Sequence, residues 1–535
     1  MRLPAAFVPL RHPVFRMLWV ATLVSNIGGW VQSTAAGWVM TSLSPSPLMV
    51  SLVQVASLLP VFLLALPAGA LADIVDRRRF LLGTQVWVCA VACLLCVLTS
   101  LGALGPWGLL ALTFLIGVGA AANFPAWAAT TPELVPRADL AQAIVLNGMA
   151  FNLARAVGPA FGGLLIGWVG AGAAFAFNAL SFLVLIAAIL AWKRAPRSDA
   201  LPSEGLLDAM RAGLRYVAAS PAMRGVIVRG VVAFFSASAV WGLLPLLVRQ
   251  RLGLGPEAFG LLLGCMGIGA VSAGFALPGL RARVSPSAMV VWGSIACGAS
   301  IILLGLSTHW LPAVLAMLAY GASWLAVAST LSAAAQMAAR PWVRARAIGL
   351  FQVATFGGLA AGSATGGVLG SAYGIPVALT AFGIACAVLS VLVRHLPLEA
   401  PPAVPDSGTA ARAEPMPAAA SPDLLALFDE SRDRVLESVR YEVPAADRAA
   451  FLSAMAEVRG VRLRAGALLW RLYEDVARPE RYLEIWAVPS WTDHLREQGR
   501  LSEADHAALI RAAAFHRAEP GPQAERFLQV PLALA

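Results

Sequence analysis

Arg155 is the residue whose position most clearly implies chemistry, because it stands near the middle of a long apolar run, 141–168. A charge in the middle of a bilayer is costly unless it faces protein or water. Asn147 and Asn152 stand two turns and just under one turn before Arg155, and their side chains could accept hydrogen bonds from it. The position predicts a central binding site. The alternative is that Arg155 anchors one helix to another.

Acidic side chains that could carry coupling protons are missing from the middle of the apolar runs. All eight acids of residues 1–398 fall in loops or at run ends: Asp73, Asp76, Glu133, Asp139, Asp199, Glu204, Asp208 and Glu257. The sequence therefore gives little support to a mechanism in which a carboxylate in the membrane carries protons. Two alternatives remain. Asp73, at the cytoplasmic edge of its apolar run, could carry the coupling, or the substrate could bear a charge opposite to that of Arg155.

The elements that must position these residues are twelve apolar runs, each long enough to cross a hydrocarbon core of about 30 Å. They lie near 17–40, 48–72, 80–102, 106–129, 141–168, 173–192, 223–248, 258–280, 287–306, 310–338, 345–370 and 374–393. A composition of 59% hydrophobic and 13% charged residues is typical of a polytopic protein in the lipid bilayer. All six cysteines fall inside these runs, so we expect no disulfides.

Lysine and arginine gather in loops on one face of the predicted bundle, among them 77–79, 193–224 and 340–346. The opposite face has only Arg249 and Arg251. Because basic loops are retained in the cytoplasm, both termini are predicted to be cytoplasmic. The high pI, near 9.9, is then explained by these basic loops. We expect no nucleic-acid partner, no cofactor and no metal.

Glycines recur at a fixed distance along the chain. A shift of 204 residues superposes Gly158, Gly162 and Gly163 on Gly362, Gly366 and Gly367. This repetition predicts two six-helix halves in parallel repeat, at 17–192 and 223–396. The glycines would let neighbouring helices approach closely, and Pro159 would kink its helix by removing one backbone hydrogen bond.

Three stretches carry a resemblance to a known family. They are Asn26 to Gln32, Pro67 to Asp73 and Phe151 to Pro159. The second stretch runs into the charged loop at 69–79, and the third into a Gly-Pro-x-x-Gly-Gly motif at 158–163. The chain resembles the major facilitator superfamily of secondary transporters, in the bacterial subgroup of the enterobactin-exporter type. The resemblance implies export of a small organic solute, such as a siderophore, drug or secondary metabolite, by alternating access. The glycine motif is typical of exporting, antiporter branches.

The resemblance also implies a gating motif in the inner loop, made of Gly69, Leu71, Asp73, Arg77 and Arg78. In the family, the small residue lets two helices approach, and the acid faces a helix N-terminus and an arginine. Asp73 and one of the two arginines would play these parts. Ile74 and Asp76 depart from the family pattern, which usually has arginine and glycine there.

In this superfamily the first, second, fourth and eleventh helices line a central cavity. Polar residues of those runs here are Asn26, Gln32, Ser33, Thr34, Gln54, Asn123, Gln352 and Thr355. With Trp30, Trp38, Trp127 and Trp241 they would form an amphipathic pocket for a bulky, partly aromatic small-molecule substrate. Each of these residues alone could equally hold two helices together or anchor a helix at the membrane interface. Arg229, about two turns into the seventh run, could snorkel to the inner interface.

The remaining residues divide into an N-terminal arm at 1–16, a charged middle loop at 193–222, a Pro/Ala-rich linker at 397–435 and a soluble domain at 436–530. The soluble domain alternates Val439, Tyr441 and Val443 with polar residues, as a half-buried strand does. Its predicted order, β-α-β-β-α-β, resembles the ferredoxin-like dimeric α+β barrel of antibiotic-biosynthesis monooxygenases.

We expect this tail to be a regulatory or dimerising module and not an enzyme. No metal-spaced cluster of histidine and cysteine is present, and His494 stands in a polar helical stretch typical of a protein surface. The resemblance implies a homodimer, sheet against sheet. An active monooxygenase-like tail is the alternative, and a lipid flippase or sensor is the alternative for the bundle.

Overall fold

The computed structural model describes residues 5–74, 76–192, 206–340, 342–398, 434–519, 521–522 and 524–528. Within these ranges twelve helices are long and apolar enough to span a membrane, which confirms the predicted count. The spans of the first half are α1 (Pro13–Leu43), α2 (Pro47–Ile74), α3 (Arg77–Ser100), α4 (Pro106–Leu134), α5 (Leu140–Val169) and α6 (Ala171–Ala191).

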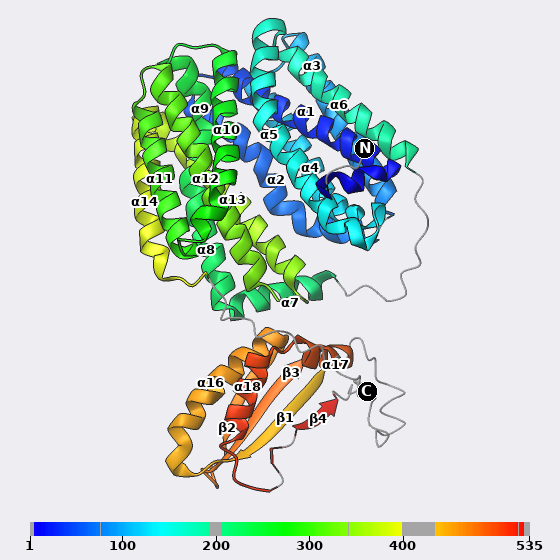
Figure 1. Ribbon diagram of the computed structural model, residues 1–535, viewed down its shortest axis with the longest axis vertical. Coiled ribbons are helices and arrows are strands. Elements are labelled where there is room, and N and C mark those ends of the chain that lie inside the picture. The colour runs from blue at the N-terminus through cyan, green and yellow to red at the C-terminus, as the bar shows by residue number, and fades with distance from the viewer. Residues whose placement is uncertain are drawn as a thin grey trace, which may run out of the picture. The chain divides into compact units, whose positions relative to one another are not determined.

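The second half begins with a span in three pieces, α8 (Pro221–Ala237), α9 (Ala239–Leu246) and a π-helical turn, Leu247–Arg251. The other spans are α10 (Pro256–Arg281), α11 (Pro286–Leu306), α12 (Trp310–Ala338), α13 (Arg344–Tyr373) and α14 (Ile375–Leu392). Figure 1 shows α1–α6, blue to cyan, beside α8–α14, green to yellow. The predicted six-plus-six architecture is confirmed.

The ends of the spans follow from local chemistry. A proline begins α1, α4 and α10, where its missing N–H leaves no helical hydrogen bond unmade. Asp76 caps α3 by accepting a hydrogen bond from the backbone N–H of Arg79 at 3.0 Å. Gly170 and Gly374, which are 204 residues apart, both have positive φ (104° and 86°) where α5 and α13 end. The repeat thus includes its helix-terminating glycines.

The two halves meet where glycines remove side chains. A Cβ at Gly163 of α5 would lie 2.7 Å from Cα of Gly260 in α10. The corresponding residue of the repeat, Gly367 of α13, would place a Cβ 2.7 Å from Cβ of Ser51 in α2. Each half therefore contributes one tight helix crossing to the same seam.

Polar contacts reinforce one end of this seam. Arg249, in the π-helical turn, donates hydrogen bonds to the hydroxyls of Thr41 and Ser42 at 3.0 and 2.5 Å. The backbone N–H of Leu48 donates to the hydroxyl of Ser371 at 3.1 Å. These contacts tie the ends of α1 and α2 to the second half.

A second compact unit contains α7 (Leu206–Ala219), residues 335–350 and the C-terminal tail. The tail contains β1 (Val435–Glu442), α16 (Arg448–Ala465), β2 (Leu469–Glu474), β3 (Arg481–Val488), α17 (Trp491–Arg500), α18 (Glu503–Ala513) and β4 (Ala524–Leu528). Its antiparallel sheet has the order β2-β3-β1-β4. This is the predicted ferredoxin-like topology, with a second helix divided in two at Leu501–Ser502.

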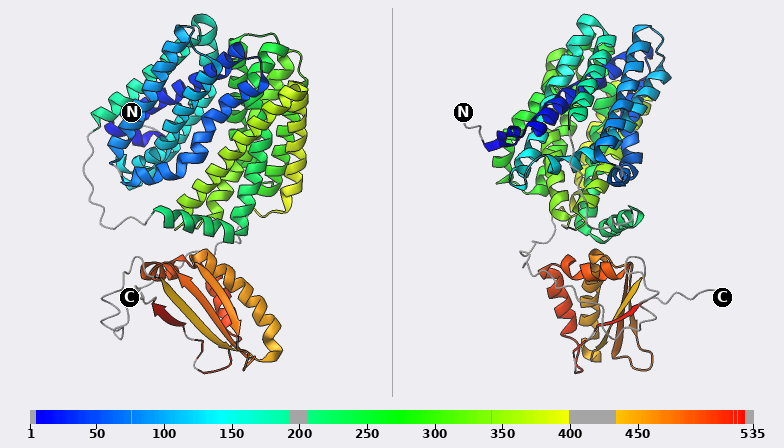
Figure 2. Two further views of the ribbon diagram at one scale, coloured as in Figure 1. Left: turned by 180° about the vertical axis from the view of Figure 1, so that it is seen from behind. Right: turned by 90° about the vertical axis from the view of Figure 1, so that its right-hand side faces the viewer.

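The sheet of the tail has one covered and one exposed face. Strand alternation places Val435 and Trp486 on the covered face, where they pack with Phe451 and Met455 of α16. Figure 2 shows the helices on this side of the sheet. The opposite face carries exposed apolar side chains, namely those of Leu469, Tyr473 and Phe527. The Pro/Ala-rich linker predicted at 397–435 lies almost entirely outside the described residues.

Candidate functional site

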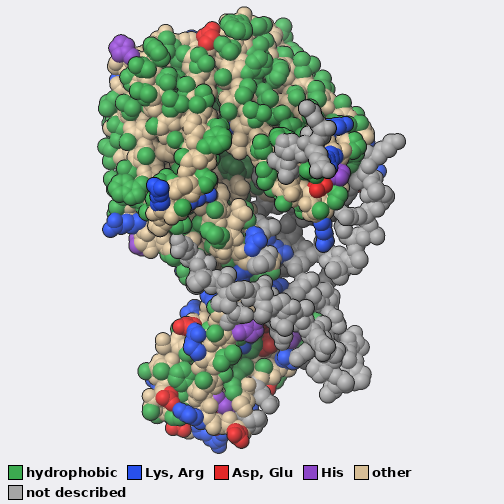
Figure 3. All heavy atoms as spheres, in the orientation of Figure 1, with side chains coloured by type: hydrophobic (Ala, Val, Ile, Leu, Met, Phe, Trp, Pro, Cys, Tyr) green, Lys and Arg blue, Asp and Glu red, His purple; other side chains and the backbone are tan. Residues whose placement is uncertain are grey.

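A central cavity of about 710 Å³ lies between the two six-helix halves. The hollow between the halves in Figure 3 shows its place on one face of the molecule. Its polar lining residues are Ser25, Asn26, Gln32, Ser33, Gln54, Ser57, Gln85, Thr113, Asn123, Arg155, Ser332, Gln352 and Thr355. Such a volume falls in the range of small-molecule sites.

Three tryptophans surround the guanidinium of Arg155. Its Cζ lies 6.0 Å from the ring centre of Trp30 in α1, 5.7 Å from that of Trp241 in α9 and 5.8 Å from that of Trp324 in α12. We call these three rings the tryptophan cage. Because they come from both halves, the charge of Arg155 is held at the junction between the halves.

The cage stabilises the cation but leaves hydrogen-bonding capacity unused. The Nε atom of Arg155 is buried without a hydrogen-bond partner among the described residues, and so is the indole Nε1 of Trp241. Each ring distance is close to the outer limit of about 6 Å for a cation–π contact. Among the described residues that line the cavity, Arg155 is the only one with a charged side chain.

The aromatic surface extends beyond the cage. The Trp241 ring lies 6.0 Å from that of Trp30 and 6.2 Å from that of Trp324, between ring centres. Phe151 meets Trp30 edge to face at 6.4 Å. Phe234 meets Trp324 in the same manner at 4.9 Å. The cavity thus combines one cation with several flat apolar faces, which suits an anion with planar groups.

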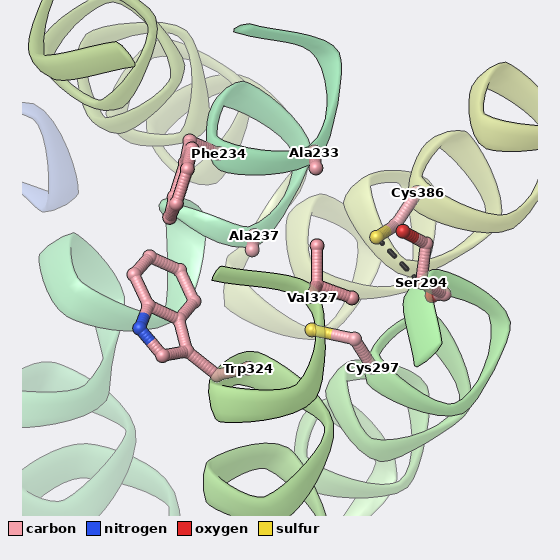
Figure 4. A pocket seen from close by; sticks show the side chains of 8 residues that line it. All are labelled: Ala233, Phe234, Ala237, Ser294, Cys297, Trp324, Val327 and Cys386. Atoms are coloured by element: carbon pink, nitrogen blue, oxygen red, sulfur yellow. Dashed lines mark hydrogen bonds between the residues drawn. The ribbon is translucent and has the colours of Figure 1, made fainter. Parts of the chain in front are cut away.

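A void of about 10 Å³ lies behind Trp324. Figure 4 shows Phe234 and Trp324 projecting from different helices on one side of it, and Cys297 and Cys386 on the other. The thiol of Cys386 donates to the backbone carbonyl of Ser294 at 3.3 Å. The void has room for at most one water molecule, so it is no solute site.

The structure brings most of the predicted pathway residues to the cavity. Those that line it are Asn26, Trp30, Gln32, Gln54, Asn123, Arg155, Trp241 and Gln352. Asn147 and Asn152 are not among them, and the expectation that they accept hydrogen bonds from Arg155 was wrong. Asn147 donates to Thr131 at 3.1 Å, and the exposed Asn152 donates to the backbone carbonyl of Gly148 at 2.9 Å.

Four further expectations about single residues need correction. Thr34, Trp38 and Trp127 do not line the cavity, and the hydroxyl of Thr34 donates to the carbonyl of Trp30. Arg229 does not snorkel: it is 1% exposed and donates to Ser287 and to the carbonyl of Leu396. It fixes α8 to α11 and to the chain after α14.

Several lining residues were not predicted from the sequence, notably Gln85 of α3, Thr113 of α4, Phe234 of α8 and Trp324 of α12. A signal for two of them was present, because Gln85 and Thr113 are polar residues in otherwise apolar spans. Trp324 gave no such signal, since a tryptophan in an apolar span is equally compatible with lipid contact.

The gating motif is described only in part. The backbone places Gly69, Leu71 and Asp73 in the last turns of α2, and their side chains lie outside the described residues. Arg77 pairs with Glu133 near the end of α4 at 2.5 Å. Arg78 donates to the carbonyls of Ile189 and Leu190 at the end of α6, at 3.1 and 2.7 Å. Both arginines therefore join span ends on one side of the first half.

The glycines of α5 lie at close helix contacts, as predicted, and Pro159 lies inside the same helix. A Cβ at Gly158 would lie 2.5 Å from Cβ of Trp30, and one at Gly162 would lie 3.0 Å from Cα of Val31. Close packing of α5 on α1 thus presents Trp30 to Arg155. Gly362 and Gly366 of α13 approach α8 and α9 in the same way, at Phe235 and Ala239. Pro159 is buried inside α5.

His494 of the tail is buried, which corrects the expectation of a surface residue. It is 5% exposed, and its Nδ1 lies 2.8 Å from Oε1 of Glu437. Ligand atoms of Glu437, His494 and Glu497 lie within 4.8 Å of one another, a separation that could hold a cation. Spacing of histidine and cysteine could not reveal this group, because two of its members are glutamates.

A buried arginine compensates the glutamates of the tail. Arg462 lies 3.3 Å from Glu484 and 3.2 Å from Glu497 and covers the Trp486 ring at 3.6 Å. Burial lowers the pKa of Arg462, but the charges of Glu484, Glu497 and Glu437 outweigh this effect and the pKa is raised. Burial raises the pKa of Glu497, and Arg462 offsets only part of that rise. The buried glutamates of the tail are therefore paired with Arg462 and His494 inside the domain.

Comparison with known proteins agrees with the fold and the cavity. The family model described as transmembrane secretion effector matches residues 4–532. Enterobactin exporter EntS of Escherichia coli O1:K1 is 26% identical over 325 residues, 60% of this chain and 76% of that protein. The staphyloferrin A transporter of Staphylococcus aureus is 25% identical over 290 residues, 53% of this chain and 71% of that protein.

Among solved structures, a bacterial homologue of the lysosomal transporter Spinster, inward-facing and unoccupied, superposes with a TM-score of 0.58 at 15% identity. The match covers 74% of this chain and 98% of that one. The nucleoside transporter NupG matches with a TM-score of 0.59 at 12% identity, over 72% of this chain and 98% of that one. The protein is therefore a membrane transporter with the major facilitator fold and belongs to the transmembrane secretion effector family.

Proposed function

We propose that the protein exports a small organic anion with planar groups across the bacterial cytoplasmic membrane by alternating access. The observation that carries this proposal is Arg155, held by the tryptophan cage in a cavity whose described lining has no acid. Two relatives are named for the export of enterobactin and the transport of staphyloferrin A. A siderophore or a similar secondary metabolite is accordingly the substrate class that we infer.

Electrostatics favours an anionic substrate. A guanidinium inside a bilayer loses most of its hydration, and cation–π contacts of about 0.5 to 2 kcal/mol each replace only part of it. A carboxylate or phenolate that accepts two parallel N–H donations from Arg155 would supply the missing charge and hydrogen bonds. A cationic substrate would instead be repelled.

Alternating access follows from where the halves are in contact. We assign the basic loops and both termini to the cytoplasm, so the end of the seam with Arg249, Thr41 and Ser371 faces outward. With these contacts made, the cavity is closed to the outside. Export requires the crossings at Gly163 and Gly367 to separate while the opposite ends of the spans approach.

The inner loop and the tail have inferred roles in this cycle. Asp73, Arg77 and Arg78, with Gly69 and Leu71, would form the contact that holds the inner ends together when the cavity opens outward. The tail at 436–530 would act as a dimerising or regulatory module, because its exposed apolar sheet face has Tyr473 and Phe527 at 53% and 48% exposure. A second copy is the occupant that we propose.

Transport can be tested in inside-out membrane vesicles from cells that express the full chain. Export corresponds there to accumulation, so enterobactin and staphyloferrin A are added outside and their uptake is followed by mass spectrometry. We expect uptake of at least one of them above that of vesicles without the protein. Absence of uptake of both, and of a panel of aromatic carboxylates, would refute the proposal.

A further inference from the structure

Two residues that line the cavity have a buried amide oxygen without a hydrogen-bond partner among the described residues. The side chain of Gln85 in α3 is 3% exposed, and its Oε1 accepts no hydrogen bond. The Oδ1 atom of Asn123 in α4 is buried and equally unpartnered. Both residues line the central cavity. A buried polar atom that is left unsatisfied costs about 1–3 kcal/mol, so two such atoms in one place need an explanation.

The two amides lie at the same level of neighbouring helices. Helices α3 and α4 run antiparallel and are in contact at Val88 and Gly119, where a Cβ on the glycine would overlap the valine side chain. The indole N–H of Trp87 also donates to the carbonyl of Leu115 at 2.9 Å. Gln85 stands about one turn before Val88 and Asn123 about one turn after Gly119. The pairing of the helices therefore brings the two amides to one level.

Several other amides of the same bundle are satisfied by the protein itself, although Oε1 of Gln142 in α5, outside the cavity, is also buried without a partner among the described residues. Asn178 donates to Gln32, and Asn147 donates to Thr131. Even the exposed Asn152 bonds within its own helix. Gln85 and Asn123 combine an unpartnered amide oxygen with a position in the cavity lining, which favours a ligand as their partner.

We propose that Gln85 and Asn123 form a second subsite of the cavity, which accepts hydrogen bonds from hydroxyl or amide N–H groups of the substrate. The proposal rests on the proposed function, in which Arg155 binds the anionic part. The two subsites are complementary: Arg155 and the indole of Trp241 offer unused donors, whereas Gln85 and Asn123 offer unused acceptors. The substrate class narrows to organic anions that also carry phenolic, alcoholic or amide donors.

Two probes with the same carboxylate separate the subsites. N-(2,3-dihydroxybenzoyl)serine has two phenolic donors, and its dimethoxy analogue has none in those positions. Binding to the purified full chain in nanodiscs is followed by quenching of tryptophan fluorescence. We expect the wild-type chain to bind the dihydroxy probe about tenfold more tightly, which corresponds to about 1.4 kcal/mol.

The decisive variant is the double substitution Gln85→Leu with Asn123→Leu. It should reduce the ratio of the two dissociation constants to about one while affinity for the dimethoxy probe stays within about twofold. Asn152→Leu, at an exposed amide outside the cavity, is the matched control and should keep the tenfold ratio. An unchanged ratio in the double variant would overturn the subsite.

Thermal stability without ligand separates a binding role from a structural one. Leucine in place of an unpartnered buried amide removes an unsatisfied polar group, so Tm of the double variant should stay the same or rise. A fall of several degrees would show that the amides hold the fold together and would overturn the proposal. So would a failure of both probes to bind the wild-type chain.

Arg155→Gln distinguishes this inference from the proposed function. If that variant weakens both probes equally while the tenfold ratio persists, both ideas stand. If Arg155→Gln weakens both probes but the double leucine variant leaves the ratio unchanged, the proposed function stands and the amide subsite fails. If the ratio responds to the leucines but Arg155→Gln leaves both affinities unchanged, the subsite stands and the anion site fails.

Discussion

Replacement of Arg155 should weaken substrate binding and transport by an amount that its surroundings define. The three ring distances of 5.7–6.0 Å lie at the weak end of cation–π geometry, so the cage alone compensates little of the charge. An anion bound to Arg155 gains a charge-assisted hydrogen bond of about 1.5–3 kcal/mol. Arg155→Gln removes that bond, and the dissociation constant should rise about 10- to 150-fold.

Graded substitutions separate charge from geometry. Arg155→Lys keeps the charge and loses the planar fork of donors, so it should retain part of the affinity and flux, whereas Arg155→Ala should abolish flux. Dissociation constants come from tryptophan quenching and flux comes from inside-out vesicles, with expression checked by immunoblot. Arg394→Gln, at an exposed position after α14, is the control and should behave like the wild type. Wild-type flux in Arg155→Ala would refute the reasoning and make Arg155 a structural residue.

Three further predictions concern the gate and the tail. Asp73→Asn should slow flux at normal expression, because it removes a charge at the hinge between two spans; unchanged flux would contradict this role. Arg462→Met should destabilise the tail by about 3–5 kcal/mol in urea unfolding, since it leaves Glu484 and Glu497 buried without their cation. Arg440→Met, which breaks an exposed pair, should cost less than about 1 kcal/mol, and equal losses would refute the burial argument. Tyr473→Lys with Phe527→Lys should convert a dimer of the full chain in detergent into a monomer by light scattering, whereas Leu452→Lys on the helical side should not; a monomeric wild-type chain would remove the dimer.

Hydropathy and residue spacing were sufficient to predict the twelve spans and the ferredoxin-like tail, because both depend on patterns local in sequence. The direction in which a side chain points inside the bundle is not local. On a helix with about 3.6 residues per turn, Asn152 lies about 60° to one side of Arg155 and Asn147 about 80° to the other. Arg155 faces the cavity, while Asn152 is exposed and Asn147 contacts Thr131.

The sequence predicts polar residues in apolar spans as one set. Only the three-dimensional structure separates those that bond to another side chain from those that do not. Gln32 has Asn178 as a partner, whereas Oε1 of Gln85 has none among the described residues, and nothing in the sequence separates the two cases. The burial of His494 could have been predicted from the strand that contains Glu437. Glu437 alternates in phase with Val439 and Tyr441, so it belongs to the covered face of the sheet and needs a buried partner.

Under the proposed function, in which Arg155 binds an anion, the charge of Arg155 also couples the transport cycle to the membrane voltage. A carrier whose cavity holds one positive charge becomes neutral there when it binds a monoanion, so the loaded carrier changes conformation without moving net charge in its cavity. The empty carrier returns with its positive charge toward the negative interior of the cell. Each cycle then gains up to about 2.3 kcal/mol per 100 mV of potential. Voltage alone could drive export of a monoanion, with no proton carrier in the membrane.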